Sequence, residues 1–240
     1  MNGATQSGST WRSRGVAFFM LVIALLVLRP ESRAQDFEVD LALVLAIDCS
    51  FSVDAREFRL QMEGLGQALQ NPQVKRAIRQ GARQRIAVTV MQWSDDNNQM
   101  VVVPWSIVSG DADADELGMV LGQMPRRLAQ GGTSISTALL YASALFQSAP
   151  SAERRVIDMS SDGRNNIGPP VAAARNRIVA EGITINGLPI LNEWPTLDTY
   201  FEAHVVGGRD HFVMPAANYE DYAEAILRKL LREITGPGIS

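Results

Sequence analysis

Apolar runs and amphipathic segments alternate along most of the chain, a pattern typical of alternating strands and helices. Leu41–Ile47 is wholly apolar between polar residues, which predicts a strand covered on both faces. Asp54 with Glu57 resembles a capping box and predicts a helix start, and Asn71-Pro72 predicts its end. Further strands are predicted at 85–93, 99–105, 155–160, 183–190 and 211–214, and further helices at 113–124, 135–146, 171–180, 197–204 and 219–234.

The second and third predicted strands are joined by Ser94-Asp95-Asp96-Asn97-Asn98, a short run of turn-forming residues. So short a link predicts an antiparallel hairpin, whereas the other strands are separated by helices. We therefore expect an α/β fold of the Rossmann-like, doubly wound type, with a mostly parallel sheet and one antiparallel edge hairpin. No internal repeat or low-complexity linker is visible, which predicts one domain at 35–240.

The first 34 residues have the three parts of a secretory signal peptide. Basic Arg12 and Arg14 precede the apolar run Val16–Leu28, and Ser32-Arg33-Ala34 offers small residues before a cleavage point. The run is shorter than the ~20 residues of a spanning helix. We expect cleavage near Ala34 and export to the periplasm or beyond, with an uncleaved membrane anchor as the alternative.

Charge and cysteine content narrow the classes of partner. Without four of the 22 basic and one of the 26 acidic residues, which lie in 1–34, the remaining chain has a net charge of −7. Such a domain is a poor candidate for nucleic acid, whose binding depends on Lys and Arg. The basic residues between Lys75 and Arg85 are interpreted as a solvated helix end and turn. Cys49 is the single cysteine, so it has no disulfide partner within the chain, and we expect it to be buried.

Three short segments offer hydroxyls and carboxylates where the predicted fold would gather them. Asp48-Cys49-Ser50-Phe51-Ser52 follows the first strand, Gly131-Gly132-Thr133-Ser134 precedes a helix, and Ser160-Ser161-Asp162-Gly163 follows another strand. In open α/β sheets, ligands bind beyond the carboxyl ends of the strands. A set of oxygen ligands suits hard cations such as Mg²⁺, Mn²⁺ or Ca²⁺.

Each segment also has a simpler interpretation when it is taken alone. Asp48 to Ser52 could be a helix cap, Gly131 to Ser134 a turn with a cap or an anion site, and Asp162-Gly163 an ordinary turn. Their order, spacing and shared sheet edge favour a joint metal role.

Together the three segments resemble the metal-ion-dependent adhesion site of von Willebrand factor A domains. The resemblance covers about residues 40–234. It implies that Ser50, Ser52 and Thr133 contact the metal directly, and that Asp48 and Asp162 do so directly or through water. It also implies Mg²⁺ or Mn²⁺, with Ca²⁺ less favoured, and a protein partner that supplies an Asp or Glu side chain.

Residues 154–163 and His211–Met214 are similar to a narrower proteobacterial group of secreted A domains that is described only as a domain of unknown function. The function expected is a metal-dependent protein-binding module of the bacterial periplasm or envelope, not an enzyme. The sequence has no Ser elbow, P-loop or zinc-spaced histidine pair, and so no candidate base beside a nucleophile. A metal-assisted phosphohydrolase and a structural subunit whose metal only stabilises the loops remain as alternatives.

Three polar residues near these segments are harder to assign. Asp158 lies within a predicted buried strand, where a charge is costly unless it is paired, so a structural salt bridge is favoured over a metal role. Asn165 and Asn166 follow Asp162 and could either position the site or belong to a solvated loop.

Overall fold

The computed structural model describes residues 1–3 and 38–236. The predicted signal peptide and its cleavage point lie outside the described residues, apart from positions 1–3. No helix in the described ranges is both long and apolar enough to span a bilayer.

Five strands within residues 38–236 form one sheet in the order β3-β2-β1-β4-β5. Only β2 and β3 pair in an antiparallel manner, and the other neighbours are parallel. This arrangement confirms the predicted mostly parallel sheet with an edge hairpin. The strands are β1 (Val39–Asp48), β2 (Ile86–Trp93), β3 (Gln99–Val108), β4 (Ala152–Ser161) and β5 (Thr184–Pro189).

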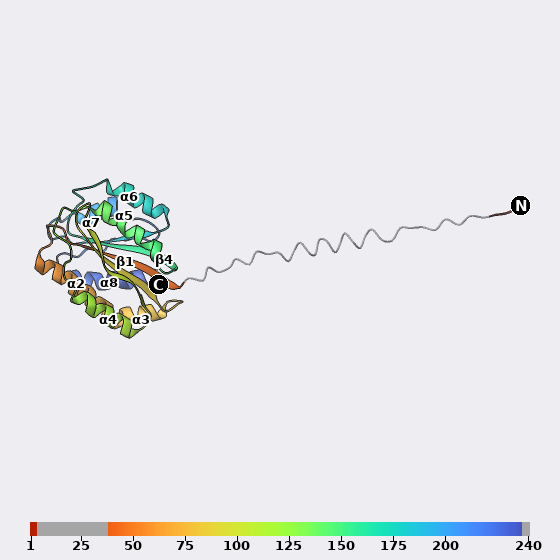
Figure 1. Ribbon diagram of the computed structural model, residues 1–240, viewed down its shortest axis with the longest axis horizontal. Coiled ribbons are helices and arrows are strands. Elements are labelled where there is room, and N and C mark those ends of the chain that lie inside the picture. Colours follow the sequence, from red (N-terminus) through yellow and green to blue (C-terminus); the bar gives the residue numbers. More distant parts are fainter. Residues whose placement is uncertain (4–37, 237–240) are drawn as a thin grey trace. The chain divides into compact units, whose positions relative to one another are not determined.

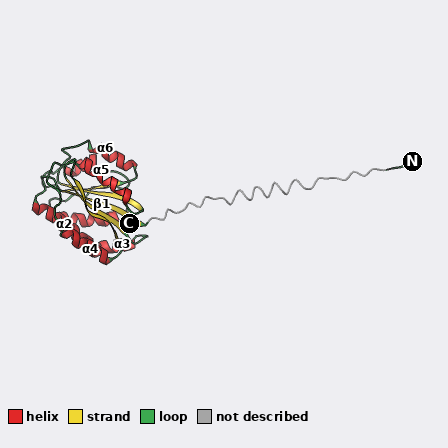
Figure 2. Cartoon of the chain, in the orientation of Figure 1, coloured by secondary structure: helices red, strands yellow, loops and turns green. Residues whose placement is uncertain are grey.

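Helices cover both faces of this sheet, which explains why β1 is buried throughout (Figures 1 and 2). Side chains of a strand point alternately to its two faces. Leu41, Leu43 and Leu45 therefore join the core beneath one helical layer, and Val44 and Ala46 join the core beneath the other. The first layer contains α2 (Ala55–Gln70), α3 (Pro72–Gln80), α4 (Asp111–Gly122) and α8 (Tyr222–Thr235), and the second contains α5 (Ile135–Leu145), α6 (Val171–Ala180) and α7 (Leu197–Tyr200).

The capping box at the start of α2 is confirmed, but the chain beyond Pro72 differs from the prediction. Asp54 accepts a hydrogen bond from the Glu57 amide at 2.7 Å, and the Glu57 carboxylate accepts one from the Asp54 amide at 2.8 Å. Asn71 ends α2 and also caps α3, where Pro72 occupies the first turn. A proline at that position has no amide hydrogen bond to lose, so it begins a second helix as readily as it ends the first.

The predicted strand at 211–214 and the predicted start of the last helix were also wrong. The segment 211–214 is not a strand, because it meets the sheet only through an isolated bridge between Gly187 and Val213. The last helix begins at Tyr222 rather than Tyr219. The residues before it form a loop, and Tyr219 points from that loop to a carboxylate of the candidate site described below.

The order of the strands sets the position of that site. From β1 the chain moves outward to β2 and β3, then returns to place β4 on the other side of β1. The strand order therefore reverses between β1 and β4, the position where open α/β sheets bind ligands. Asp48 is the last residue of β1, and Asp162 directly follows β4.

Candidate metal centre

The first predicted segment turns sharply around the Asp48 carboxylate. Asp48 Oδ1 accepts a hydrogen bond from the Ser50 amide at 2.7 Å. The hydroxyl oxygens of Ser50 and Ser52 lie 3.1 Å apart, so the alternating residues face one another as the D-x-S-x-S pattern predicts. Asp48 and Ser50 are fully buried, whereas Ser52 is exposed, so the group opens to solvent on the Ser52 side.

The third segment meets the first through its hydroxyl and carboxylate groups. The Ser52 hydroxyl donates to Asp162 Oδ1 at 2.5 Å, and the Ser161 hydroxyl donates to Asp48 Oδ2. These bonds connect residues more than a hundred positions apart in the sequence. The two aspartates are therefore held together at the carboxyl ends of β1 and β4.

Thr133, from the second segment, is placed beside Asp162 by backbone contacts. Its amide donates to Asn166 Oδ1 at 2.8 Å, and its carbonyl accepts from the Asn166 amide at 2.9 Å. A β-carbon added to Gly163 would lie 3.4 Å from Thr133 Oγ1, so the hydroxyl lies against the turn after Asp162. The structure thus brings all five predicted ligand residues into one group, and Asn166 positions the site.

The glycines before Thr133 allow the close approach expected of them. A side chain at Gly131 would collide with the Asp95 carboxylate, and the Gly131 carbonyl accepts a hydrogen bond from the Phe51 amide at 2.9 Å. Asn165 Oδ1 accepts from the Ser136 amide at 3.0 Å, which ties the loop after Asp162 to the first turn of α5.

The electrostatics of the group favour a cation. Burial and the nearby charge of Asp162 raise the pKa of Asp48 to about 7. Burial also raises the pKa of Asp162. Among residues 38–236, no Lys, Arg or His forms an ion pair with either carboxylate. Hydroxyls and amides satisfy the two acids, but no group of the described chain neutralises them.

The donor set fits a hard divalent ion. It consists of two carboxylates and three hydroxyls, all oxygen, the ligand atom that Mg²⁺ prefers. Within the described ranges no three His, Cys, Asp or Glu side chains gather closely enough to hold a metal on their own. A cation at this position would therefore depend on the Ser50, Ser52 and Thr133 hydroxyls as well as the carboxylates.

Two contacts of the site were not predicted. Tyr219 donates its hydroxyl to Asp162 Oδ2 at 2.9 Å, and the Ser161 bond to Asp48 was likewise missed. Ser161 belongs to the segment Ser160-Ser161-Asp162-Gly163, so its position in the sequence could have indicated this contact. Tyr219 lies 57 residues after Asp162 in the sequence, in a loop whose sequence looks like the first turn of the last helix. No local pattern therefore indicates its contact with Asp162.

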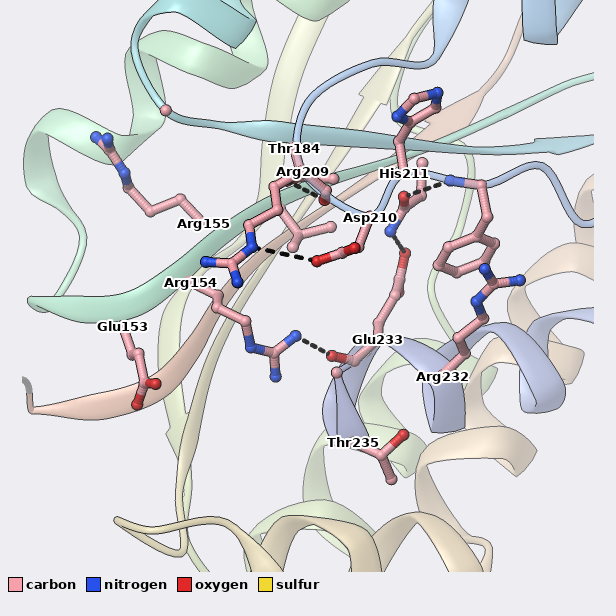
Figure 3. A pocket seen from close by; sticks show the side chains of 15 residues that line it. Glu153, Arg154, Arg155, Thr184, Arg209, Asp210, His211, Arg232, Glu233 and Thr235 are labelled. Atoms are coloured by element: carbon pink, nitrogen blue, oxygen red, sulfur yellow. Dashed lines mark hydrogen bonds and ion pairs between the residues drawn. The ribbon is translucent and has the colours of Figure 1, made fainter. Parts of the chain in front are cut away.

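A cavity lies at the opposite end of the sheet from the candidate metal centre. It has a volume of about 1050 Å³ and is lined by the starts of β4 and β5 and the end of α8 (Figure 3). Arg154, at its floor, donates to the backbone carbonyls of Glu233 at 2.6 Å and Ile234 at 2.8 Å. Arg209 pairs with Asp210 at 3.3 Å. Arg154 thus satisfies helix-end carbonyls, and the cavity shares no residue with the metal centre.

The side chains of both histidines and of the cysteine form hydrogen bonds or ring contacts with residues other than the proposed ligands. His204 packs on Tyr200 with ring centres 4.9 Å apart, and His211 Nδ1 lies 2.8 Å from the Gly208 carbonyl. Cys49 is free and fully buried, as expected, and burial raises the pKa of its thiol to about 12.

This sheet order, with a hydroxyl-rich group at the strand reversal, is the arrangement of a von Willebrand factor A fold, and solved structures agree. Proximal thread matrix protein 1 from the mussel byssus superposes with a TM-score of 0.62 at 16% identity, over 83% of this chain and 49% of that one. The pilus adhesin SpaC from Lactobacillus rhamnosus GG gives 0.57 at 14% identity, over 82% and 30%. A von Willebrand factor type A protein from Catenulispora acidiphila gives 0.55 at 19% identity, over 84% and 44%.

The chain itself belongs to the family described as "Protein of unknown function (DUF1194)", whose model matches residues 38–238. No curated protein matches it. It spans half or less of the length of these solved chains. Because the sequence identities are below 20%, the similarity establishes only the fold.

Proposed function

We propose that this protein is an exported, metal-dependent protein-binding module rather than an enzyme. It binds Mg²⁺ or Mn²⁺ at the group formed by Asp48, Ser50, Ser52, Thr133 and Asp162. One observation carries the proposal: two buried carboxylates lie together at the strand reversal, and no cation of the described chain pairs with them. Burying such charges is costly unless an ion or a proton compensates them.

The five residues would contribute to ion binding in two different ways. The Ser50, Ser52 and Thr133 hydroxyls would supply neutral oxygen ligands, and Asp48 and Asp162 would supply the negative charge directly or through water. The ion, when bound, supplies positive charge and a coordination position for an incoming group. Because only two carboxylates accompany it, the site favours an Asp or Glu side chain from a partner.

Similar proteins support a binding role. One mussel byssus structure is described with a zinc-occupied metal-ion-dependent adhesion site, and SpaC is a pilus adhesin. For this chain we propose the periplasm or the cell envelope, on the basis of the signal-peptide pattern at 1–34 and of the secreted group that it resembles.

A calorimetric titration of the full-length protein with Mg²⁺, Mn²⁺ and Ca²⁺ tests the proposal. We expect one-to-one binding that is lost in Asp48→Ala and in Thr133→Ala. Glu153→Gln is the matched control, because it removes an exposed charge at the opposite end of β4. Equal binding by the wild type and both site variants would contradict the proposed site.

The two alternatives give different results. Turnover of phosphoesters in Mg²⁺ that stops in EDTA would identify a metal-assisted phosphohydrolase. A metal that raises the melting temperature while no acidic ligand ever competes for it would identify a structural subunit.

A further inference from the structure

Large apolar side chains are exposed around the candidate metal centre. Phe51 is 71% exposed, Trp194 48% and Ile167 39%. Within residues 38–236 the other large exposed apolar side chains lie on β3 (Met100, Ile107) and α4 (Met119, Val120). Exposed aromatic and aliphatic side chains that gather at one place mark interaction surfaces, whereas scattered ones are ordinary.

Phe51 and Ile167 lie on either side of the glycines that lead to Thr133. Phe51 stands between two of the proposed ligands, Ser50 and Ser52, and its amide donates to the Gly131 carbonyl at 2.9 Å. A β-carbon added to Gly132 would lie 3.1 Å from Ile167 Cγ2. Both residues therefore lie against the Gly131-Gly132 turn that leads to Thr133, and Phe51 directly precedes the exposed Ser52 in the chain.

Trp194 is held on another side of the site by Arg164, which follows Asp162 by two residues. The Arg164 guanidinium lies 5.1 Å from the Trp194 ring centre and 5.5 Å from that of Tyr200. It also donates to the Thr196 hydroxyl at 2.8 Å. These contacts hold the indole and a cationic group in place near the end of β4, which lowers the entropy cost of binding a partner there.

Phe51, Ile167 and Trp194 with their neighbours form the rim of the candidate site. The charges on this rim argue against binding to a lipid surface. Glu193 directly precedes Trp194, and the neighbouring Asn192 donates to Glu57 Oε1 at 3.3 Å, so the carboxylates of Glu57 and Glu193 add to those of the site and make the rim acidic. Anionic lipids are attracted by Lys and Arg clusters, and an acidic rim repels them. A bound divalent ion and Arg164 instead complement a single carboxylate.

We infer that Phe51, Ile167 and Trp194 form the docking surface for a protein loop that presents one Asp or Glu between apolar side chains. The carboxylate meets the metal, and the apolar neighbours cover the three exposed side chains. The inference rests on the proposed function and adds the chemistry of the partner to it. Aromatic anchors near a desolvated polar contact carry most of the energy in such interfaces.

The test is a selection of random cyclic peptides displayed on phage against the full-length protein in Mg²⁺, with elution by EDTA. We expect the eluted peptides to share an Asp or Glu with an apolar residue on at least one side. Binding of these peptides should weaken roughly tenfold to a hundredfold in the triple variant Phe51→Ser, Ile167→Ser, Trp194→Ser, since a few anchoring side chains carry most of the binding energy of an interface.

The control is Met119→Ser, Val120→Ser, which removes two equally exposed apolar side chains from α4 and should leave binding unchanged. The triple variant should keep its metal affinity and melting temperature, because all three side chains are exposed. Eluted peptides that carry an acid without apolar neighbours, or that bind the triple variant as well as the wild type, would overturn the docking surface alone. An absence of any EDTA-eluted peptide sensitive to Thr133→Ala would overturn both this inference and the proposed function, as would metal-independent capture by phosphatidylglycerol vesicles.

Discussion

Two acidic clusters lie along β4, and they differ in the source of their neutralising charge. Asp158 lies within the strand, with its Oδ1 2.6 Å from Lys229 Nζ on α8, and the same ammonium lies 2.6 Å from Glu233. Asp162, four residues later, shares its site with Asp48 and contacts hydroxyl groups instead. The first cluster contains its own cation, and the second does not.

Burial raises the pKa of an aspartate in both clusters, so the two clusters differ mainly in the groups that contact their carboxylates. Burial and Glu233 raise the pKa of Asp158 to about 7 even though Lys229 lowers it, and burial with Asp162 raises that of Asp48 to about 7. Asp158 and Lys229 are buried between strand and helix, which suits a structural role. The Asp48 cluster opens to solvent at Ser52, so an external ion can enter.

Removing the internal cation should have the largest effect. Lys229→Met leaves Asp158 and Glu233 buried without a cation, which typically costs about 3–5 kcal/mol of unfolding free energy. Urea denaturation near pH 7.5 measures this loss. A loss below about 1 kcal/mol would mean that the lysine contributes no more than a surface pair does.

The pH dependence of the unfolding free energy should change when Asp158 is replaced. Its folded pKa is raised above the unfolded value, so the folded state binds the proton more tightly, and stability falls as pH rises from about 4 to about 7. We expect Asp158→Asn to remove about 4 kcal/mol of this decline, since one pKa unit corresponds to about 1.4 kcal/mol. Urea denaturation of both proteins at several pH values provides the measurement, and parallel curves would contradict the assignment.

The external cation should stabilise only the open cluster. At about one hundred times its dissociation constant, Mg²⁺ or Mn²⁺ should raise the unfolding free energy by ~2.7 kcal/mol. Asp48→Asn should abolish this gain, and Asp158→Asn should preserve it because Asp158 pairs with Lys229 and is not one of the proposed ligands. Thermal melts with metal and with EDTA compare the three proteins. A gain that survives in Asp48→Asn would place the metal elsewhere.

Tyr219→Phe should produce the smallest change. It removes the 2.9 Å hydrogen bond that orients Asp162 and leaves the aromatic ring in the core. Groups that orient metal ligands typically contribute at least about tenfold in affinity, so we expect metal binding to weaken by roughly tenfold. Calorimetry measures it, with Tyr222→Phe as a control of the same chemistry on α8. Equal affinity in wild type and Tyr219→Phe would show that Asp162 needs no such support.

Local sequence patterns predicted an element correctly where residues a few positions apart define that element. The apolar run of β1 and the Asp54–Glu57 box identified their elements, because periodicity and capping depend on residues a few positions apart. They failed at Pro72, which suits both the end of one helix and the start of the next.

The five proposed ligand residues were all visible in the sequence, since each stands at the end of a predicted strand or the start of a predicted helix. Short-range rules also showed that Asp158 needs a partner. They could not say that the partner is Lys229, because a lysine on the buried side of α8 looks the same in the sequence as one that faces solvent.

By itself the sequence determined the alternation of most strands and helices, the doubly wound class and the five residues proposed to hold a hard cation. Only the tertiary structure decided which groups complete each cluster: Ser161 on Asp48, Tyr219 on Asp162, and Lys229 between Asp158 and Glu233. It also decided that Phe51, Ile167 and Trp194 remain exposed instead of joining the core. The physical reason is distance along the chain: periodicity and capping act between near neighbours, whereas these contacts form only when packed layers bring remote segments together.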